Sequence, residues 1–388
     1  MNIKKHTRKI YRTGRSILHN KLWLLIILLL CAIVLPSASC RSTDIKSGSR
    51  NTRIGFTICD FTYVNDEGVE EVLTTAVWYP TKEKPQTFTY NNGFTSSVAP
   101  DAAPDRDRGP YPLIIFNHGL YASGIRSLPL TEYLAGQGFI VAAPDFTDTK
   151  PLDFVTIVAT DRIKGTEGIT NAEDVLEILD EFTQVIADNK EVLLDYLEKF
   201  RLKKSRSVID SMLELNCTDS SPFYGLIDEN AIGMAGHSLG GLTTLGLIGK
   251  HYDPAMKDPR IKAALVLSAP AYPFEGSNTY IDTPIMVIYG EYDLPSLKPD
   301  VLRTVSYDNA SPPKYYVVLK NCSHFAFSNT PCKNYDSIPE CQECDSKVQV
   351  INSYSTAFFN RYLKQDYNAE EVLQKTDDMF FLYEYEED

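Results

Sequence analysis

The 388-residue sequence is short of positive charge, of long hydrophobic runs and of histidine. It has 38 Lys and Arg against 51 Asp and Glu, so its net charge is −13 at pH 7. Without a basic face to neutralise phosphates, we do not expect the chain to bind nucleic acid. Its longest apolar run, Leu22–Leu35, falls short of the roughly 20 residues that a membrane-spanning helix needs. Only six histidines are present, which narrows the search for a catalytic base.

The first 40 residues have the three parts of an export signal. Residues 1–21 carry seven basic side chains and no acidic one, the apolar run follows, and small residues lead to Cys40. This order is typical of a signal peptide. The Ser-Ala-Ser-Cys sequence resembles a bacterial lipoprotein cleavage site, although Ser37 stands where such sites usually carry leucine. Residues 1–40 therefore predict a signal peptide or lipoprotein leader and an extracytoplasmic protein, with a retained membrane anchor as the alternative.

Six cysteines follow the leader. An even number of cysteines in an exported chain favours disulfides. A zinc site built on Cys341-x-x-Cys344 and two further thiolates is the alternative, but its ligand spacing is irregular. The pairing stays open, since four cysteines alone allow three connectivities. The six are Cys59, Cys217, Cys322, Cys332, Cys341 and Cys344.

The folded part follows a polar tether over residues 41–53 and shows neither internal repeats nor a dividing linker. Strand-like and helix-like segments alternate along 54–388, which predicts one α/β domain with a mostly parallel sheet and helices on both faces. The polar stretch 80–111 should be a loop, either folded over a site or lying on the surface. Residues 190–230 should form a small helical cap beside the site or a surface helix pair. The acidic tail from Glu370 should be loosely attached. Eight strands are expected, over 54–61, 72–79, 112–117, 138–144, 232–235, 262–268, 284–289 and 315–319.

A glycine-flanked serine follows the fifth expected strand. The stretch Gly236-His237-Ser238-Leu239-Gly240 matches G-x-S-x-G and precedes a helix-like run. This pattern is typical of a nucleophile elbow, a sharp strand-to-helix turn that presents a serine hydroxyl. A Cβ at either glycine would collide with the turn, and the helix start offers N–H groups to an oxyanion. Taken alone, the pattern also fits an ordinary glycine-rich turn.

A serine nucleophile needs a base and a carboxylate that orients the base. Elimination among the histidines leaves His324, which follows the last expected strand, where doubly wound sheets place their sites. Asp293 follows the preceding strand and is the best candidate for the carboxylate, with Glu291 as the alternative. The order Ser238, Asp293, His324 is the order of the α/β-hydrolase triad.

Two main-chain N–H groups should form the oxyanion hole. Leu239, directly after the nucleophile, should supply one of them. The other should come from the loop after the third expected strand, which reads His118-Gly119-Leu120. Leu120 is the expected donor and Tyr121 the alternative.

Several stretches give the chain a resemblance to the α/β-hydrolase superfamily, and within it to platelet-activating-factor acetylhydrolases and dienelactone-hydrolase-like serine esterases. The resemblance implies Ser238 as nucleophile, Asp293 and His324 as its partners, and Leu120 as an oxyanion-hole donor. Dienelactone hydrolases proper use a cysteine nucleophile, so the chain departs from them. The stretches that carry the resemblance are Val77-Trp78-Tyr79-Pro80, Leu113–Leu120, Leu134–Asp145, Gly233–Gly241 and Ala357–Leu363.

The sequence therefore predicts an exported serine hydrolase of α/β-hydrolase fold that cleaves carboxylic esters through an acyl-enzyme. Metals and organic cofactors are not required. Candidate substrates are short-chain acyl esters, phospholipid sn-2 acetyl-type esters and polyester fragments. Membrane contact is expected only through an N-terminal lipid or an uncleaved anchor. An amidase or peptidase on the same scaffold, and a binding protein that kept the fold without turnover, are the alternatives.

Overall fold

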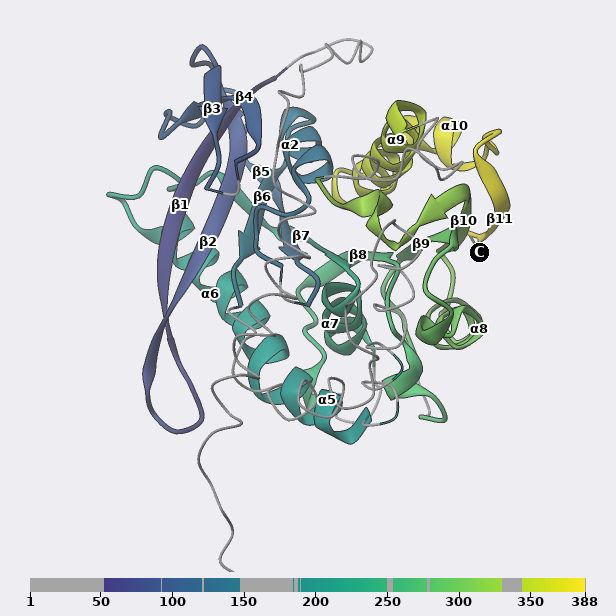
Figure 1. Cartoon of the computed structure of the whole chain (residues 1–388). Helices are drawn as coiled ribbons and strands as arrows, with labels where there is room; N and C mark the ends of the chain where they lie inside the picture. Colours follow the sequence, from purple (N-terminus) through teal and green to yellow (C-terminus); the bar gives the residue numbers. More distant parts are fainter. Residues whose placement is uncertain are drawn as a thin grey trace, which may run out of the picture.

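The computed structural model describes residues 52–387 except 92, 121, 147–183, 185–187, 189, 250–253, 278–279 and 330–343. The expected leader and almost all of the tether lie outside the described residues, as does Tyr121. Figure 1 shows the described part as one α/β body built around a twisted sheet.

A single eleven-stranded sheet forms the centre, in the order β11-β10-β9-β8-β7-β5-β6-β2-β1-β4-β3. Neighbouring strands from β6 to β10 are parallel to one another. Their residues are apolar and almost entirely buried, as strands covered on both faces must be. The parallel strands are β5 (Tyr111–Asn117), β6 (Ile140–Pro144), β7 (Ile227–His237), β8 (Ile261–Leu267), β9 (Ile285–Tyr292) and β10 (Lys314–Ser323).

Mostly antiparallel pairs complete both edges of the sheet, the exception being the parallel pair of β1 and β4. A long hairpin of β1 (Arg53–Val64) and β2 (Glu70–Thr81) joins the parallel part through β6. Strand β4 (Thr95–Pro100) pairs with β1 and β3 (Gln86–Thr89), and β11 (Phe380–Glu386) pairs antiparallel with β10.

All eight expected strands are present, but the sheet has three more than the sequence predicted. Two of them, β3 and β4, lie in the stretch expected to be a loop, and the third, β11, lies in the tail expected to be loosely attached. Each is a short or acidic strand at or next to an edge of the sheet, without a clear apolar alternation. Tertiary contacts stabilise them instead: Val98 of β4 is buried, and Glu384 and Glu386 pair with Arg303 and Lys314.

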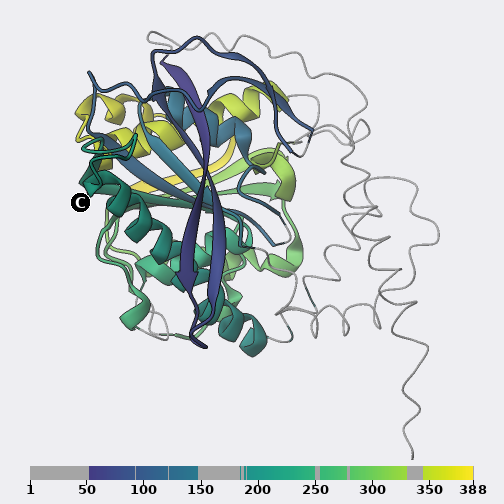
Figure 2. The same cartoon turned by 90° about the vertical axis from the view of Figure 1, so that its left-hand side faces the viewer.

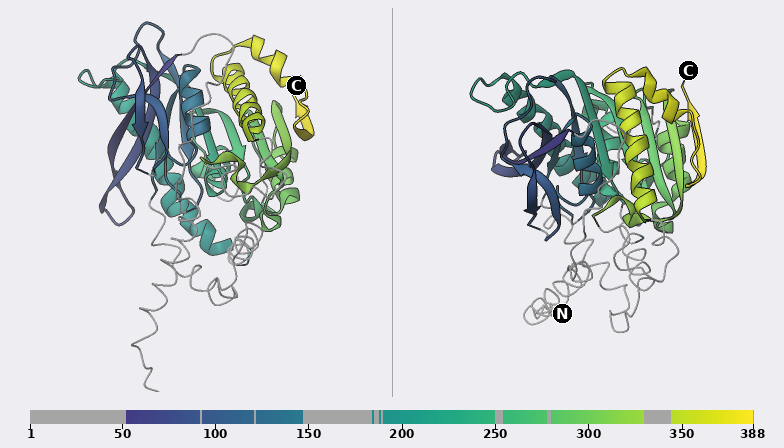
Figure 3. Two further views of the ribbon diagram at one scale, coloured as in Figure 1. Left: turned by 45° about the horizontal axis from the view of Figure 1, so that its top comes forward. Right: turned by 90° about the horizontal axis from the view of Figure 1, so that it is seen from above.

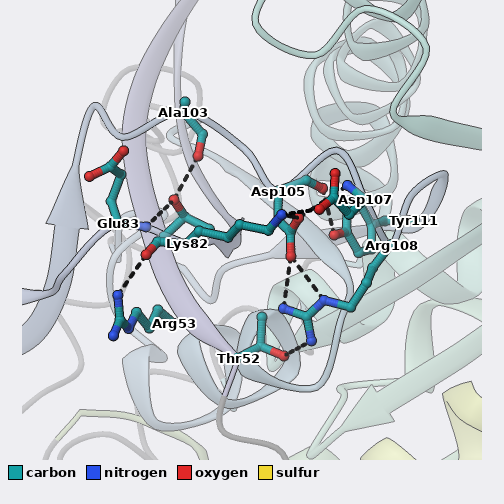
Figure 4. A network of polar contacts seen from close by, with 10 residues as sticks. Thr52, Arg53, Lys82, Glu83, Ala103, Asp105, Asp107, Arg108 and Tyr111 are labelled. Carbon is teal, nitrogen blue, oxygen red and sulfur yellow. Dashed lines mark hydrogen bonds and ion pairs between the residues drawn. The ribbon is translucent and has the colours of Figure 1, made fainter.

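The chain after β4 is also fixed, by a polar network around the buried carboxylate of Asp105 (Figure 4). Arg108 Nη2 and Lys82 Nζ lie 2.9 Å and 3.4 Å from its two oxygens. The hydroxyl of Tyr111 donates to the main-chain oxygen of Asp105 at 2.6 Å. Most of the stretch 80–111 is therefore a structured edge of the sheet.

Helices cover both faces of the sheet (Figures 2 and 3). One face is covered by α2, α9 and α10, and the other by α5 to α8 with their connecting turns. The bounds are α2 (Leu128–Gly136), α5 (Lys190–Tyr196), α6 (Lys203–Cys217), α7 (Leu239–Ile248), α8 (Pro299–Arg303), α9 (Cys344–Leu363) and α10 (Glu370–Leu373).

The segment 190–230 differs from the small cap that we expected. Its helix α6 packs against β1, β5, β6 and β7, with Val208, Ile209 and Met212 in the core. The apolar side chains at helical spacing thus face the sheet itself. A π-helical turn, η1 (Leu197–Leu202), joins α5 to α6 and contacts α7.

Two of the six cysteines, Cys59 and Cys217, are free thiols in the structure. Cys59 lies in β1, Cys217 ends α6 and Cys322 lies in β10, so they belong to separate elements. Burial raises the pKa of Cys59 to about 11. Cys59 and Cys217 therefore form no disulfide in the structure, and a disulfide among the other cysteines stays a prediction, since Cys332 and Cys341 lie outside the described residues. Within those residues there is no group of metal-ligating side chains and no helix that could span a membrane.

Candidate active site

The turn between β7 and α7 holds Ser238 at φ 56° and ψ −122°. Such positive φ values are strained for a residue with a side chain and are a feature of nucleophile elbows. A Cβ on Gly236 would lie 2.1 Å from the carbonyl oxygen of Gly240, and one on Gly240 would lie 1.9 Å from that of Asn117. Both distances are far below contact, so the turn needs both glycines.

The structure brings His324 and Asp293 together at the carboxyl ends of β10 and β9. His324 Nδ1 lies 2.7 Å from Asp293 Oδ1, and the side chains are 9% and 6% exposed. The same carboxylate oxygen accepts the N–H of Leu294 at 2.8 Å. Burial alone would raise the pKa of Asp293, but the charge and hydrogen bond of His324 hold that pKa below its usual value. The alternative acid, Glu291, accepts the N–H of Asn321 at 2.9 Å.

The neighbour of the nucleophile, His237, connects the elbow to the histidine loop. Its Nε2 lies 2.8 Å from the carbonyl oxygen of His324, and the two rings are 4.7 Å apart between centroids. Burial lowers the pKa of His237 to about 3, so the ring is neutral and Nε2–H donates to the carbonyl. Sequence reasoning missed this contact, which joins two residues 87 positions apart in the chain.

The turn after β5 lies against the nucleophile, as the oxyanion-hole prediction requires. A Cβ on Gly119 would lie 3.3 Å from the Cβ of Ser238. Leu239 is the first residue of α7, and the first N–H groups of a helix have no partner within it. Within the described part of the chain, the N–H groups of Leu120 and Leu239 have no acceptor.

A buried arginine, which sequence reasoning also missed, lies behind this turn. Arg201 belongs to the π-helical turn η1 and has no exposed surface. Its Nη1 donates to the carbonyl oxygen of His118 at 2.8 Å and its Nη2 to that of Gly119 at 3.3 Å. Its position in a charged, helical segment carries no signal that would distinguish it from a surface arginine.

The parallel sheet, with a strained serine and a histidine–carboxylate pair beyond its strand ends, defines an α/β-hydrolase. Within this class, the chain belongs to the family "Platelet-activating factor acetylhydrolase, isoform II", whose sequence model matches residues 66–381. Family membership makes the protein a carboxylic ester hydrolase and confirms the resemblance inferred from the sequence.

One related protein and one solved structure of similar fold illustrate the similarity. The platelet-activating factor acetylhydrolase of Cavia porcellus is 24% identical over 325 residues, which cover 76% of this chain and 71% of that protein. The structure of a ferulic acid esterase from Streptomyces cinnamoneus aligns with a TM-score of 0.57 at 17% identity. That alignment covers 87% of this chain and 99% of the esterase, and it shows a shared fold.

Proposed function

We propose that the protein is an exported serine esterase that uses Ser238, His324 and Asp293 as a triad. The observation that carries the proposal is the pairing of His324 with Asp293 at 2.7 Å, next to an elbow that holds Ser238 in a strained conformation. His237 provides the physical link between the two parts, because it lies beside Ser238 in sequence and donates to His324.

The reaction follows from these positions. The hydroxyl of Ser238 attacks the ester carbonyl carbon while His324 takes the hydroxyl proton, and Asp293 stabilises the imidazolium. The oxyanion accepts hydrogen bonds from the N–H groups of Leu120 and Leu239. When the intermediate collapses, the alcohol leaves with the proton from His324. Water then attacks the acyl-enzyme, with His324 again as base, and releases the acid and Ser238. No step needs a metal or an organic cofactor.

The proposed substrates are short-chain acyl esters, including phospholipid sn-2 acetyl-type esters, with polyester fragments as a further class. The names of the related protein and the structural neighbour, an acetylhydrolase and a ferulic acid esterase, support small esters. The leader-like residues 1–40 support export and an extracytoplasmic location, with membrane attachment through a lipid on Cys40 or an uncleaved anchor.

Hydrolysis of p-nitrophenyl esters from acetate to palmitate tests the proposal, with Ser238→Ala as the inactive variant. Ser221→Ala, which alters another buried serine in the turn after α6, is the matched control. We expect the wild type and the control to hydrolyse the shorter esters and Ser238→Ala to lose at least a thousandfold, on the order of what triad serines contribute.

Other outcomes would identify the alternatives. Faster cleavage of a matched amide than of the ester would indicate an amidase. Absence of turnover together with absence of fluorophosphonate labelling at Ser238 would refute the esterase proposal and favour a binding protein.

A further inference from the structure

The peptide group between Gly119 and Leu120 is held by a buried cluster that the reaction steps above do not use. Arg201 reaches it from η1 with one hydrogen bond, from Nη2 to the carbonyl oxygen of Gly119, while Nη1 donates to the carbonyl oxygen of the preceding peptide, that of His118. The guanidinium carbon of Arg201 also lies 4.3 Å from the centroid of the Phe146 ring. A buried charge is costly, and an apolar side chain of similar size would often fill such a position at least as well. The position therefore calls for a functional explanation.

Further donors meet at the carbonyl oxygen of Gly119. Nε2 of His118 accepts the main-chain N–H of Phe146 at 3.0 Å. Because a main-chain N–H can only donate, Nε2 carries no proton and Nδ1 does. Nδ1 of His118 therefore donates to the oxygen of Gly119, at 2.6 Å. The N–H of Ala122 lies 3.3 Å from the same oxygen. With Arg201, three donors converge on one carbonyl.

This carbonyl and the N–H of Leu120 belong to the same peptide group. The group is planar and trans, so its N–H points away from its C=O. Donors that fix the oxygen of Gly119 therefore fix the direction of the Leu120 N–H. They also draw electron density toward the oxygen, which strengthens the N–H as a donor, by about 10–30% for each bond in a chain.

We propose that Arg201 is a positioning residue for the oxyanion hole, acting through the Gly119–Leu120 peptide. The inference rests on the proposed function, because it assumes that the Leu120 N–H binds the oxyanion. Arg201 lies in a π-helical turn, an irregularity that occurs frequently at functional sites. His118 shares the task as the second side-chain donor to the carbonyl of Gly119.

The test compares Arg201→Met with Arg201→Lys. Met keeps much of the volume and removes the charge and both hydrogen bonds, while Lys keeps the charge but not the fork of two donors. The matched control is Lys204→Met, which removes another buried cation from the same helical segment, where it pairs with Glu71 at 2.7 Å. Each protein is titrated with a fluorophosphonate to count its active sites, so that kcat is expressed per active site. The affinity of each protein for a trifluoromethyl ketone, which forms an oxyanion when it binds, is measured separately.

Removal of one oxyanion-hole donor typically lowers kcat about 10²–10³-fold. Arg201 acts through such a donor, so we expect Arg201→Met to lose roughly 10–100-fold in kcat with little change in KM. Affinity for the trifluoromethyl ketone should fall by a similar factor. Arg201→Lys should lie between Met and the wild type, and Lys204→Met should keep kcat per site.

Wild-type kcat and ketone affinity per titrated site in Arg201→Met would overturn the inference and leave Arg201 a purely structural role. If Arg201→Met does not fold, Arg201→Lys provides the test. Wild-type kcat and ketone affinity in that variant would also refute a positioning role for Arg201. A wild type that neither hydrolyses an ester nor is labelled by the fluorophosphonate would instead refute the proposed function, so the two failures are distinguishable.

Discussion

Replacing Asp293 by Asn should test the triad more sharply than removing the nucleophile, because it changes charge with little change in shape. In the structure, Oδ1 accepts hydrogen bonds from both His324 Nδ1 and the N–H of Leu294. The N–H of Leu294 can only donate, so it should hold the amide oxygen of Asn at the Oδ1 position. His324 would then keep its hydrogen bond and its tautomer, and only the negative charge would be lost.

The size of the effect follows from that charge. Two unit charges about 4 Å apart attract by about 4 kcal/mol at an effective dielectric constant of about 20. Both side chains are less than one tenth exposed, so solvent screening reduces this attraction little. The imidazolium forms only during the reaction, and about 1.4 kcal/mol corresponds to a tenfold change in rate. We therefore expect Asp293→Asn to lower kcat about a thousandfold.

The assay is hydrolysis of p-nitrophenyl acetate by Asp293→Asn beside Glu291→Gln. Glu291 lies two residues away and accepts a main-chain N–H rather than the histidine, so its variant should stay within about threefold of the wild type. A loss below tenfold in Asp293→Asn, or an equal loss in Glu291→Gln, would show that the acid has been assigned wrongly.

Three further predictions concern the support of the site. The pKa of His237 is about 3 in the folded chain and about 6.5 in an unfolded one. Between these pH values the unfolded chain binds one more proton than the folded chain, so the free energy of unfolding falls by about 1.4 kcal/mol for each unit by which the pH is lowered. His237→Phe should flatten this loss in acid urea titrations and lower kcat about tenfold by removing the bond to His324. Gly240→Ala should abolish activity or folding, measured by turnover and circular dichroism, since its Cβ would meet the Asn117 carbonyl; wild-type turnover would contradict the elbow geometry. Deletion of residues 380–387 should lower Tm and cause aggregation in light scattering, because the edge of β10 would be exposed; an unchanged Tm would refute a structural role for β11.

The sequence was most informative about candidate site residues of a type with few members in the chain, when the residue directly followed an expected strand. Ser238, His324 and Asp293 each follow a buried strand, and parallel strands bring their carboxyl ends to one edge. The same logic located the turn that carries Leu120. The six parallel strands were also predictable, because buried parallel strands are short apolar runs between turns.

What the sequence could not show depends on contacts between distant segments. Arg201 lies in a charged helical stretch, and only the fold reveals that its guanidinium is buried against the carbonyls of His118 and Gly119. The segment 190–230 looked like a cap because its length exceeded a simple connection, whereas its apolar face covers the sheet. In the sequence, the residues of β11 look like an acidic tail. Only the structure shows that Arg303 and Lys314 pair with two of its glutamates.

The position of β11 has a consequence for the order in which the protein can be made. The outer edge of β10 is paired with residues 380–386, which are synthesised after the ten other strands of the sheet. A growing chain therefore cannot complete this sheet before residues 380–386 have been translated. Until then β10, whose end leads into His324, has an unpaired edge. Completion of the sheet is therefore delayed until its eleventh strand, β11, is available to pair with β10.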